Sequence, residues 1–106
     1  MNFVGSHILS VSQFDRQAIE SVFSVAEAME PYAQRKRVTR VLEGAILGSM
    51  FFEPSTRTRV SFGCAFNLLG GEGRETTEIK ATAIAKGESF YDTARVLSGY
   101  SDVIVM

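Results

Sequence analysis

The chain has 106 residues, of which 45% are apolar, and its formal net charge is −1. This length and composition predict a single folded domain with a modest core. The near-neutral charge argues against general binding to nucleic acid or membranes, because such binding depends mainly on a basic excess. Cys64 is the only cysteine, so an intrachain disulfide and a cysteine metal cluster are excluded. The sequence contains neither a basic leader followed by an apolar stretch nor an apolar run of membrane length, and we therefore expect a cytoplasmic protein.

The first predicted element is a helix over about residues 13–30. Ser12 and Asp15 resemble a capping box at its start, and apolar residues then recur at helical spacing. Pro31 is expected to end or break the helix. We interpret the apolar stripe as a face buried in the core, since any docked helix needs one. The basic segment at residues 35–40 is interpreted as a solvated connection.

An apolar run without clean alternation covers residues 45–52, which is typical of a strand covered on both faces in a parallel sheet. Pro54 ends the run. Three hydroxyls and two arginines follow within five residues, from Ser55 to Arg59, and helix-forming residues then continue up to a glycine pair. The pattern predicts a strand, a turn and a helix, with Ser55 or Thr56 as the N-cap.

This turn predicts an anion-binding site. The first N–H groups of a helix, with the positive end of its dipole, bind anions such as phosphate, and the guanidinium of Arg57 matches phosphate oxygens. Residues two apart on a helix point in nearly opposite directions, so we expect Arg57 to bind the ligand and Arg59 to support the structure. The alternative is an ordinary capped helix with two solvated arginines.

Three further elements are predicted: a short strand at residues 75–79, a helix with apolar positions between Phe90 and Tyr100, and a strand at residues 102–106. Strands that alternate with helices, with an anion signal at the carboxyl end of a strand, predict an open, doubly wound, mainly parallel α/β sheet flanked by helices. The chain stops at Met106 on an apolar strand with no helix to cover it, so we expect an incomplete domain.

Residues 51–62 read FFEPSTRTRVSF and resemble the carbamoyl-phosphate motif of the aspartate and ornithine carbamoyltransferases. Residues 85–89, Ala-Lys-Gly-Glu-Ser, resemble the second loop of this family at about the expected distance. The likeness extends from about Ser6 to Met106 and covers only the beginning of the longer family chain. It implies that residues 1–106 are a truncated N-terminal carbamoyl-phosphate-binding domain, without the amino-acid-binding domain.

The resemblance implies transfer of a carbamoyl group from carbamoyl phosphate to an amino acid, without a metal or an organic cofactor. Four residues would hold the phosphate: Ser55, Thr56, Arg57 and Thr58. Arg57 would also take up charge on the leaving phosphate, and Thr58 would bond near the carbonyl oxygen. The family places a lysine, here Lys86, so that it reaches both substrates from a neighbouring subunit of a homotrimer or of a larger assembly built on it.

The loop that carries Lys86 also bears on the choice of amine. Lys86 resembles a lysine that pairs with the aspartate carboxylates in the aspartate branch of the family, and Thr82 would add a hydroxyl from the same loop. A positive loop suits an acidic substrate better than a cationic one, so we expect L-aspartate and hence a step of pyrimidine biosynthesis. The alternatives are carbamoyl transfer to ornithine and a non-catalytic anion-binding or oligomerisation module.

The sequence departs from the family pattern at Gly63, where the family frequently has a glutamate. The expected carboxylate partner of a nearby arginine is therefore absent, which affects ion pairing within the helix rather than the phosphate site. The downstream family segments are also absent. We therefore expect the isolated chain to lack transferase activity.

Overall fold

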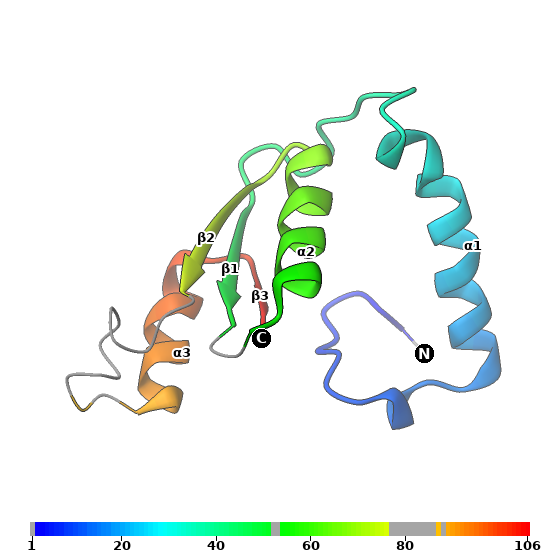
Figure 1. The fold of residues 1–106 in the computed structure, drawn as a ribbon. Coiled ribbons are helices and arrows are strands. Elements are labelled where there is room, and N and C mark those ends of the chain that lie inside the picture. The colour runs from blue at the N-terminus through cyan, green and yellow to red at the C-terminus, as the bar shows by residue number, and fades with distance from the viewer. Residues whose placement is uncertain (1, 52–53, 77–86, 88) are drawn as a thin grey trace. The chain divides into compact units, whose positions relative to one another are not determined.

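A computed structural model describes most of the chain, namely residues 2–51, 54–76, 87 and 89–106. Contacts divide it into two units, Met1–Lys36 and Arg37–Met106, which are described separately below. Figure 1 shows the helices and strands of both units. None of the described helices is long and apolar enough to cross a membrane.

The first unit contains the 3-10 helix η1 (Val11–Gln13) and the helix α1 (Arg16–Ala33). Asp15 is the N-cap of α1, and its carboxylate accepts a hydrogen bond from the Ala18 N–H at 2.7 Å. Ser12 lies inside η1 and not at the start of α1, so the predicted capping box is wrong. The short side chain of Asp15 alone satisfies a free donor of the first helical turn.

Pro31 lies inside α1, so the prediction that it ends or breaks the helix is wrong. Proline lacks a backbone donor, but it stands in the last turn, where the loss of one hydrogen bond disturbs few others. The helical bonding resumes at once, because the Gln34 N–H donates to the Glu30 carbonyl at 2.9 Å.

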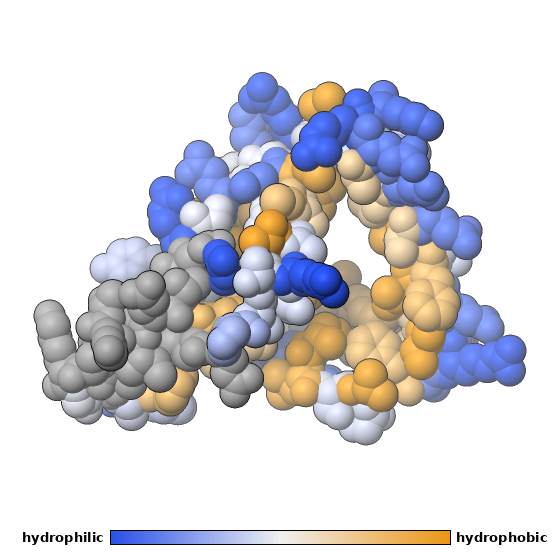
Figure 2. Space-filling model, in the orientation of Figure 1, coloured by the Kyte–Doolittle hydropathy of each residue, from blue (hydrophilic) through white to orange (hydrophobic). Residues whose placement is uncertain are grey.

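The apolar stripe of α1 is largely exposed. Ala18 is the only buried residue of this helix, whereas Val22, Phe23 and Val25 are exposed. Figure 2 shows hydrophobic residues at the surface along α1. The helical spacing of the apolar residues correctly predicted a helix. The prediction that these apolar residues are buried is wrong for most of those that the structure describes.

The second unit is built on a three-stranded parallel sheet in the order β2-β1-β3. The central strand β1 (Ile46–Met50) lies between β2 (Glu72–Thr76) and β3 (Val103–Val105). Among the described residues of this unit, Leu47 and Met50 supply the buried apolar side chains, each with 2% of its surface exposed. The burial of β1 confirms the prediction of a strand covered on both faces.

The strand β2 begins earlier than predicted. The expected strand at residues 75–79 overlaps only its last two residues, and residues 77–79 lie outside the described residues. The Gly71 N–H donates to the Phe66 carbonyl at 3.0 Å, and the Glu72 N–H donates to the Ala45 carbonyl at 3.1 Å. The chain therefore enters the sheet directly after the preceding helix, and backbone pairing with β1 defines the strand.

Two helices cover the sheet. α2 (Thr56–Leu68) contacts β1 and β2, and α3 (Phe90–Tyr100) contacts β1 and β3. Figure 1 shows them on either side of the strands. The chain passes through α2 to β2 on one side of β1 and returns by β3 to the other side, and ligands of such sheets bind at the carboxyl ends of the strands beside this reversal. The prediction of an open, doubly wound, parallel α/β sheet flanked by helices is confirmed.

Gly48 allows α3 to lie close to the central strand. A Cβ atom added to Gly48 would lie 2.6 Å from the Ser101 Oγ and 3.0 Å from the Leu97 Cγ. A side chain added at position 48 would therefore point toward α3. Successive residues of a strand face opposite sides of the sheet, so Ser49 faces the side that α2 covers.

Candidate anion-binding site

The candidate site is the corner between β1 and α2. β1 ends at Met50, and α2 begins at Thr56 with Ser55 at the N-cap position. Ser55 has φ −136° and ψ 51°, and its side chain makes no capping hydrogen bond. The N-cap position was predicted correctly, but the hydroxyl does not occupy the first N–H groups of the helix. The Ser55 side chain therefore leaves those donors, and the positive end of the helix dipole, available to a ligand.

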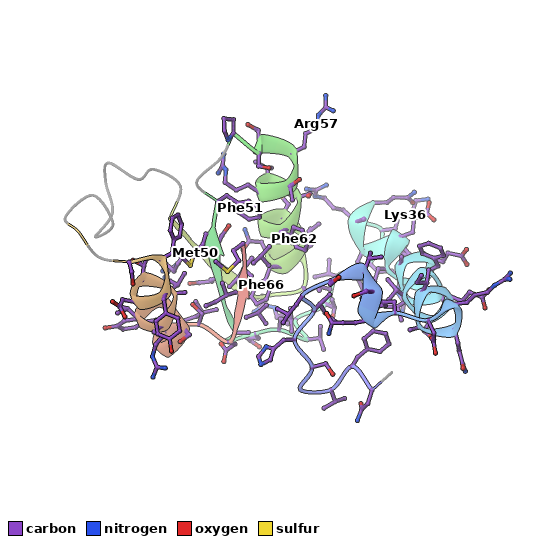
Figure 3. All side chains as sticks on the ribbon, turned by 90° about the horizontal axis from the view of Figure 1, so that it is seen from below. Lys36, Met50, Phe51, Arg57, Phe62 and Phe66 are labelled. Atoms are coloured by element: carbon purple, nitrogen blue, oxygen red, sulfur yellow. The ribbon has the colours of Figure 1, made fainter. Side chains whose placement is uncertain are left out.

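The first turn of α2 places its polar side chains at the surface. Thr56, Arg57 and Thr58 are exposed, whereas Arg59 is half-buried. Figure 3 shows Arg57 projecting outward from the beginning of α2. Three predicted ligand groups are thus accessible at one helix end, and Arg57 and Arg59 differ in burial as their opposite directions on the helix require.

The half-buried residues of α2 define the face turned toward the sheet. The N-cap Ser55 and the helix residues Arg59, Gly63 and Phe66 follow the spacing of one helical face, and Leu68 at the end of α2 is half-buried as well. The ring of Phe66 lies against Gly71, which follows the end of α2, because a Cβ added to Gly71 would clash with the Phe66 Cε1. Gly63 therefore occupies this inner face, one turn after Arg59, and offers no carboxylate there.

The loop residues predicted to act from a neighbouring subunit, Thr82 and Lys86, lie outside the described residues. The structure describes only where their loop ends. Gly87 has φ +96°, and Ser89 is the N-cap of α3, where its hydroxyl accepts a hydrogen bond from the Asp92 N–H at 3.1 Å. The corner thus brings together Ser55, Thr56, Arg57 and Thr58, and the roles of the two loop residues remain predictions.

Sequence reasoning missed Ser49. This residue was treated as part of an apolar strand, yet its side chain is 3% exposed and its Oγ has no hydrogen-bond partner among the described residues. The available signal was a hydroxyl in a run of otherwise apolar or small residues. In the described part of the chain, no three His, Cys, Asp or Glu residues gather where they could hold a metal ion.

The fold and the corner define an α/β domain in which a helix with polar and basic residues in its first turn begins beyond the carboxyl end of the central strand. Comparison with known families gives this class a name, because residues 6–106 match the model for the carbamoyl-P binding domain of aspartate/ornithine carbamoyltransferase. The chain therefore belongs to the aspartate/ornithine carbamoyltransferase family.

Individual relatives belong to one branch of this family. The chain is 79% identical to the aspartate carbamoyltransferase catalytic subunit of Saccharophagus degradans over 106 residues, which are 100% of this chain and 32% of that protein. It is 73% identical to the catalytic subunit of Cellvibrio japonicus over 106 residues, again 100% of this chain and 31% of that protein. The chain thus spans about a third of the length of the curated relatives it matches.

Solved structures agree with this assignment. Aspartate transcarbamoylase from Trypanosoma cruzi, in complex with carbamoyl aspartate and phosphate, matches with a TM-score of 0.88 and 40% identity, over 96% of this chain and 33% of that chain. The catalytic subunit of the M. jannaschii enzyme matches with a TM-score of 0.84 and 45% identity, over 92% of this chain and 33% of that chain.

Proposed function

We propose that this chain is the carbamoyl-phosphate-binding part of an aspartate carbamoyltransferase. Residues 1–106 then form an incomplete N-terminal domain, and the rest of the full-length enzyme supplies the amino-acid-binding domain. The observation that carries this proposal is the Ser-Thr-Arg-Thr-Arg sequence at residues 55–59, which opens α2 at the carboxyl end of the central strand with Arg57 exposed. The names of the relatives above support the aspartate branch.

The reaction joins the amine of L-aspartate to the carbonyl carbon of carbamoyl phosphate. A C–N bond forms, the C–O bond to phosphate breaks, and the amine loses a proton, so the products are N-carbamoyl-L-aspartate and phosphate. The site must hold a dianion and stabilise the negative charge that develops on the carbonyl oxygen and on the leaving phosphate. These demands match the groups of the corner, which are donors and one fixed cation.

Each group of the corner has a role that its position supports. The free N–H groups at the start of α2 and the hydroxyls of Ser55 and Thr56 bind phosphate oxygens. The Arg57 guanidinium donates two parallel hydrogen bonds to the phosphate and offsets its charge as it leaves. Thr58 donates to the carbonyl oxygen. Arg59, half-buried on the inner face, supports the helix.

The second half of the site comes from a neighbouring subunit. Lys86 reaches the carbamoyl phosphate and the aspartate carboxylates from the adjacent chain, and Thr82 adds a hydroxyl from the same loop. The full-length enzyme is then a cytoplasmic homotrimer that acts in pyrimidine biosynthesis. The structure of the T. cruzi relative in complex with carbamoyl phosphate and aspartate supports the pair of substrates.

The test is an assay of the full-length enzyme with carbamoyl phosphate and either L-aspartate or L-ornithine. We expect N-carbamoyl-L-aspartate with the first amine and no product with the second. Turnover of ornithine alone would overturn the choice of amine. Absence of turnover with both amines, in a protein that still binds phosphate, would favour a non-catalytic anion-binding module.

A further inference from the structure

Ser49 is the one buried side chain among the described residues whose polar atom has no hydrogen-bond partner. It is 3% exposed and stands in the middle of a sheet whose neighbouring strands pair with it on both sides. Buried hydroxyls nearly always have a partner, because the hydrogen bonds they lose to water are otherwise not replaced. Alanine would fill the same space without this cost. The hydroxyl therefore destabilises the ligand-free state, and its presence needs another reason.

The position of Ser49 indicates which part of the molecule it serves. It is the second-last residue of β1, and it faces the opposite side of the sheet from Gly48, whose side-chain direction points into α3. That opposite side is covered by α2. α2 begins shortly after the carboxyl end of β1 and runs back along the strand, so its first turn is near the end of β1 where Ser49 stands (Figure 1).

The first turn of α2 is also not fully bonded. Ser55 occupies the N-cap position without a side-chain capping bond, and its backbone has neither helical nor extended angles, with φ −136° and ψ 51°. Two hydroxyls at this corner, one buried and one at the N-cap, thus make none of the hydrogen bonds usual for their positions. A small movement of the helix start would change the surroundings of both.

We infer that Ser49 is a positioning residue for the anion-binding corner. Its hydroxyl gains a hydrogen-bond partner in the backbone of the first turn of α2 when an anion holds that turn in place. The ligand-free state carries the cost of the unpaired hydroxyl, and the anion-bound state recovers it, so Ser49 increases anion affinity at the expense of stability without ligand. This inference rests on the proposed function and adds a residue to the same site.

The test compares Ser49→Ala with the unchanged full-length enzyme. Inorganic phosphate is the probe, its dissociation constant is measured by titration calorimetry, and thermal unfolding is followed without ligand. One hydrogen bond gained only in the bound state corresponds to about a threefold to tenfold change in affinity. We expect Ser49→Ala to bind phosphate about three to ten times more weakly, while its ligand-free melting temperature is equal or higher.

Ser98→Ala is the matched control. Ser98 is an exposed serine of α3 whose hydroxyl donates to the Arg95 carbonyl at 2.7 Å, far along the chain from the corner. Its phosphate affinity should equal that of the unchanged enzyme. Phosphate affinity of Ser49→Ala within twofold of the unchanged value would overturn the inference, and so would weaker binding together with a lower ligand-free melting temperature. If the unchanged enzyme itself does not bind phosphate, the proposed function fails first and the inference fails with it.

Discussion

Gly70 follows the C-terminal end of α2, the helix that carries the candidate anion site, and its replacement by alanine should be strongly destabilising. Gly70 has φ +98°, a conformation that costs a residue with a Cβ about 1–2 kcal/mol. The added Cβ would also lie 2.8 Å from the Cα of Arg40 and 3.2 Å from its carbonyl carbon. Those are backbone atoms that cannot rotate away, and such overpacking costs about 1–3 kcal/mol.

Together these two effects predict a loss of about 2–5 kcal/mol for Gly70→Ala. The measurement is the thermal unfolding midpoint of the full-length enzyme, which should fall by about 4–20 °C at roughly 2–4 °C per kcal/mol. Gly99→Ala is the matched control. Gly99 lies inside α3 with nothing within 4 Å of an added Cβ, so alanine should stabilise the helix by about 0.5–1 kcal/mol. An unchanged midpoint for Gly70→Ala would refute the reasoning, because both causes would then be absent.

The remaining predictions concern the chain alone, the subunit boundary and the start of the central strand. The purified 106-residue chain should show no carbamoyl transfer and at most weak phosphate binding by calorimetry, and measurable turnover would contradict this. The Lys86→Ala and Arg57→Ala enzymes should each be nearly inactive. Trimers reassembled from a mixture of the two variants should regain activity, because some active sites then combine an intact Arg57 from one chain with an intact Lys86 from its neighbour. If no activity returns, Lys86 acts in the active site of its own subunit. Asp102→Ala should lower the free energy of unfolding by about 1 kcal/mol, since its carboxylate accepts from the Ile46 N–H at 2.8 Å. Asp102→Asn should lose less because it keeps an acceptor oxygen.

The corner was largely predictable from the sequence because its signals are local. An apolar run, a proline, and hydroxyls before helix-forming residues predict a strand, a turn and a helix start, and β1 and α2 lie where this pattern places them. The exposure of Arg57 and the half-burial of Arg59 follow from helical geometry alone. Local geometry therefore predicted the accessible groups of the site.

The errors arose where contacts distant in sequence decide the structure. β2 begins at Glu72 because the backbone there pairs with Ile46, and the polar composition of residues 72–74 gave no strand pattern. Pro31 is tolerated because it stands in the last turn of α1. The proline itself does not reveal how far beyond it the helix extends. The orphaned hydroxyl of Ser49 appears only when the sheet and α2 are packed together.

Arg57→Ala in the full-length enzyme tests the central claim most directly. Arg57 is exposed, so the loss of its guanidinium should weaken binding of the ligand and leave the stability of the fold unchanged. Arg16→Ala is the control, since the side chain of this arginine is 92% exposed in α1 and forms a surface ion pair with Glu20 at 3.1 Å. Removing a donor that stabilises developing charge typically costs about 100-fold to 1,000-fold in rate, so kcat/KM for carbamoyl phosphate should fall by about that factor in Arg57→Ala and remain unchanged in Arg16→Ala. A kcat/KM of Arg57→Ala within twofold of the unchanged enzyme would contradict the claim that the start of α2 binds the leaving phosphate.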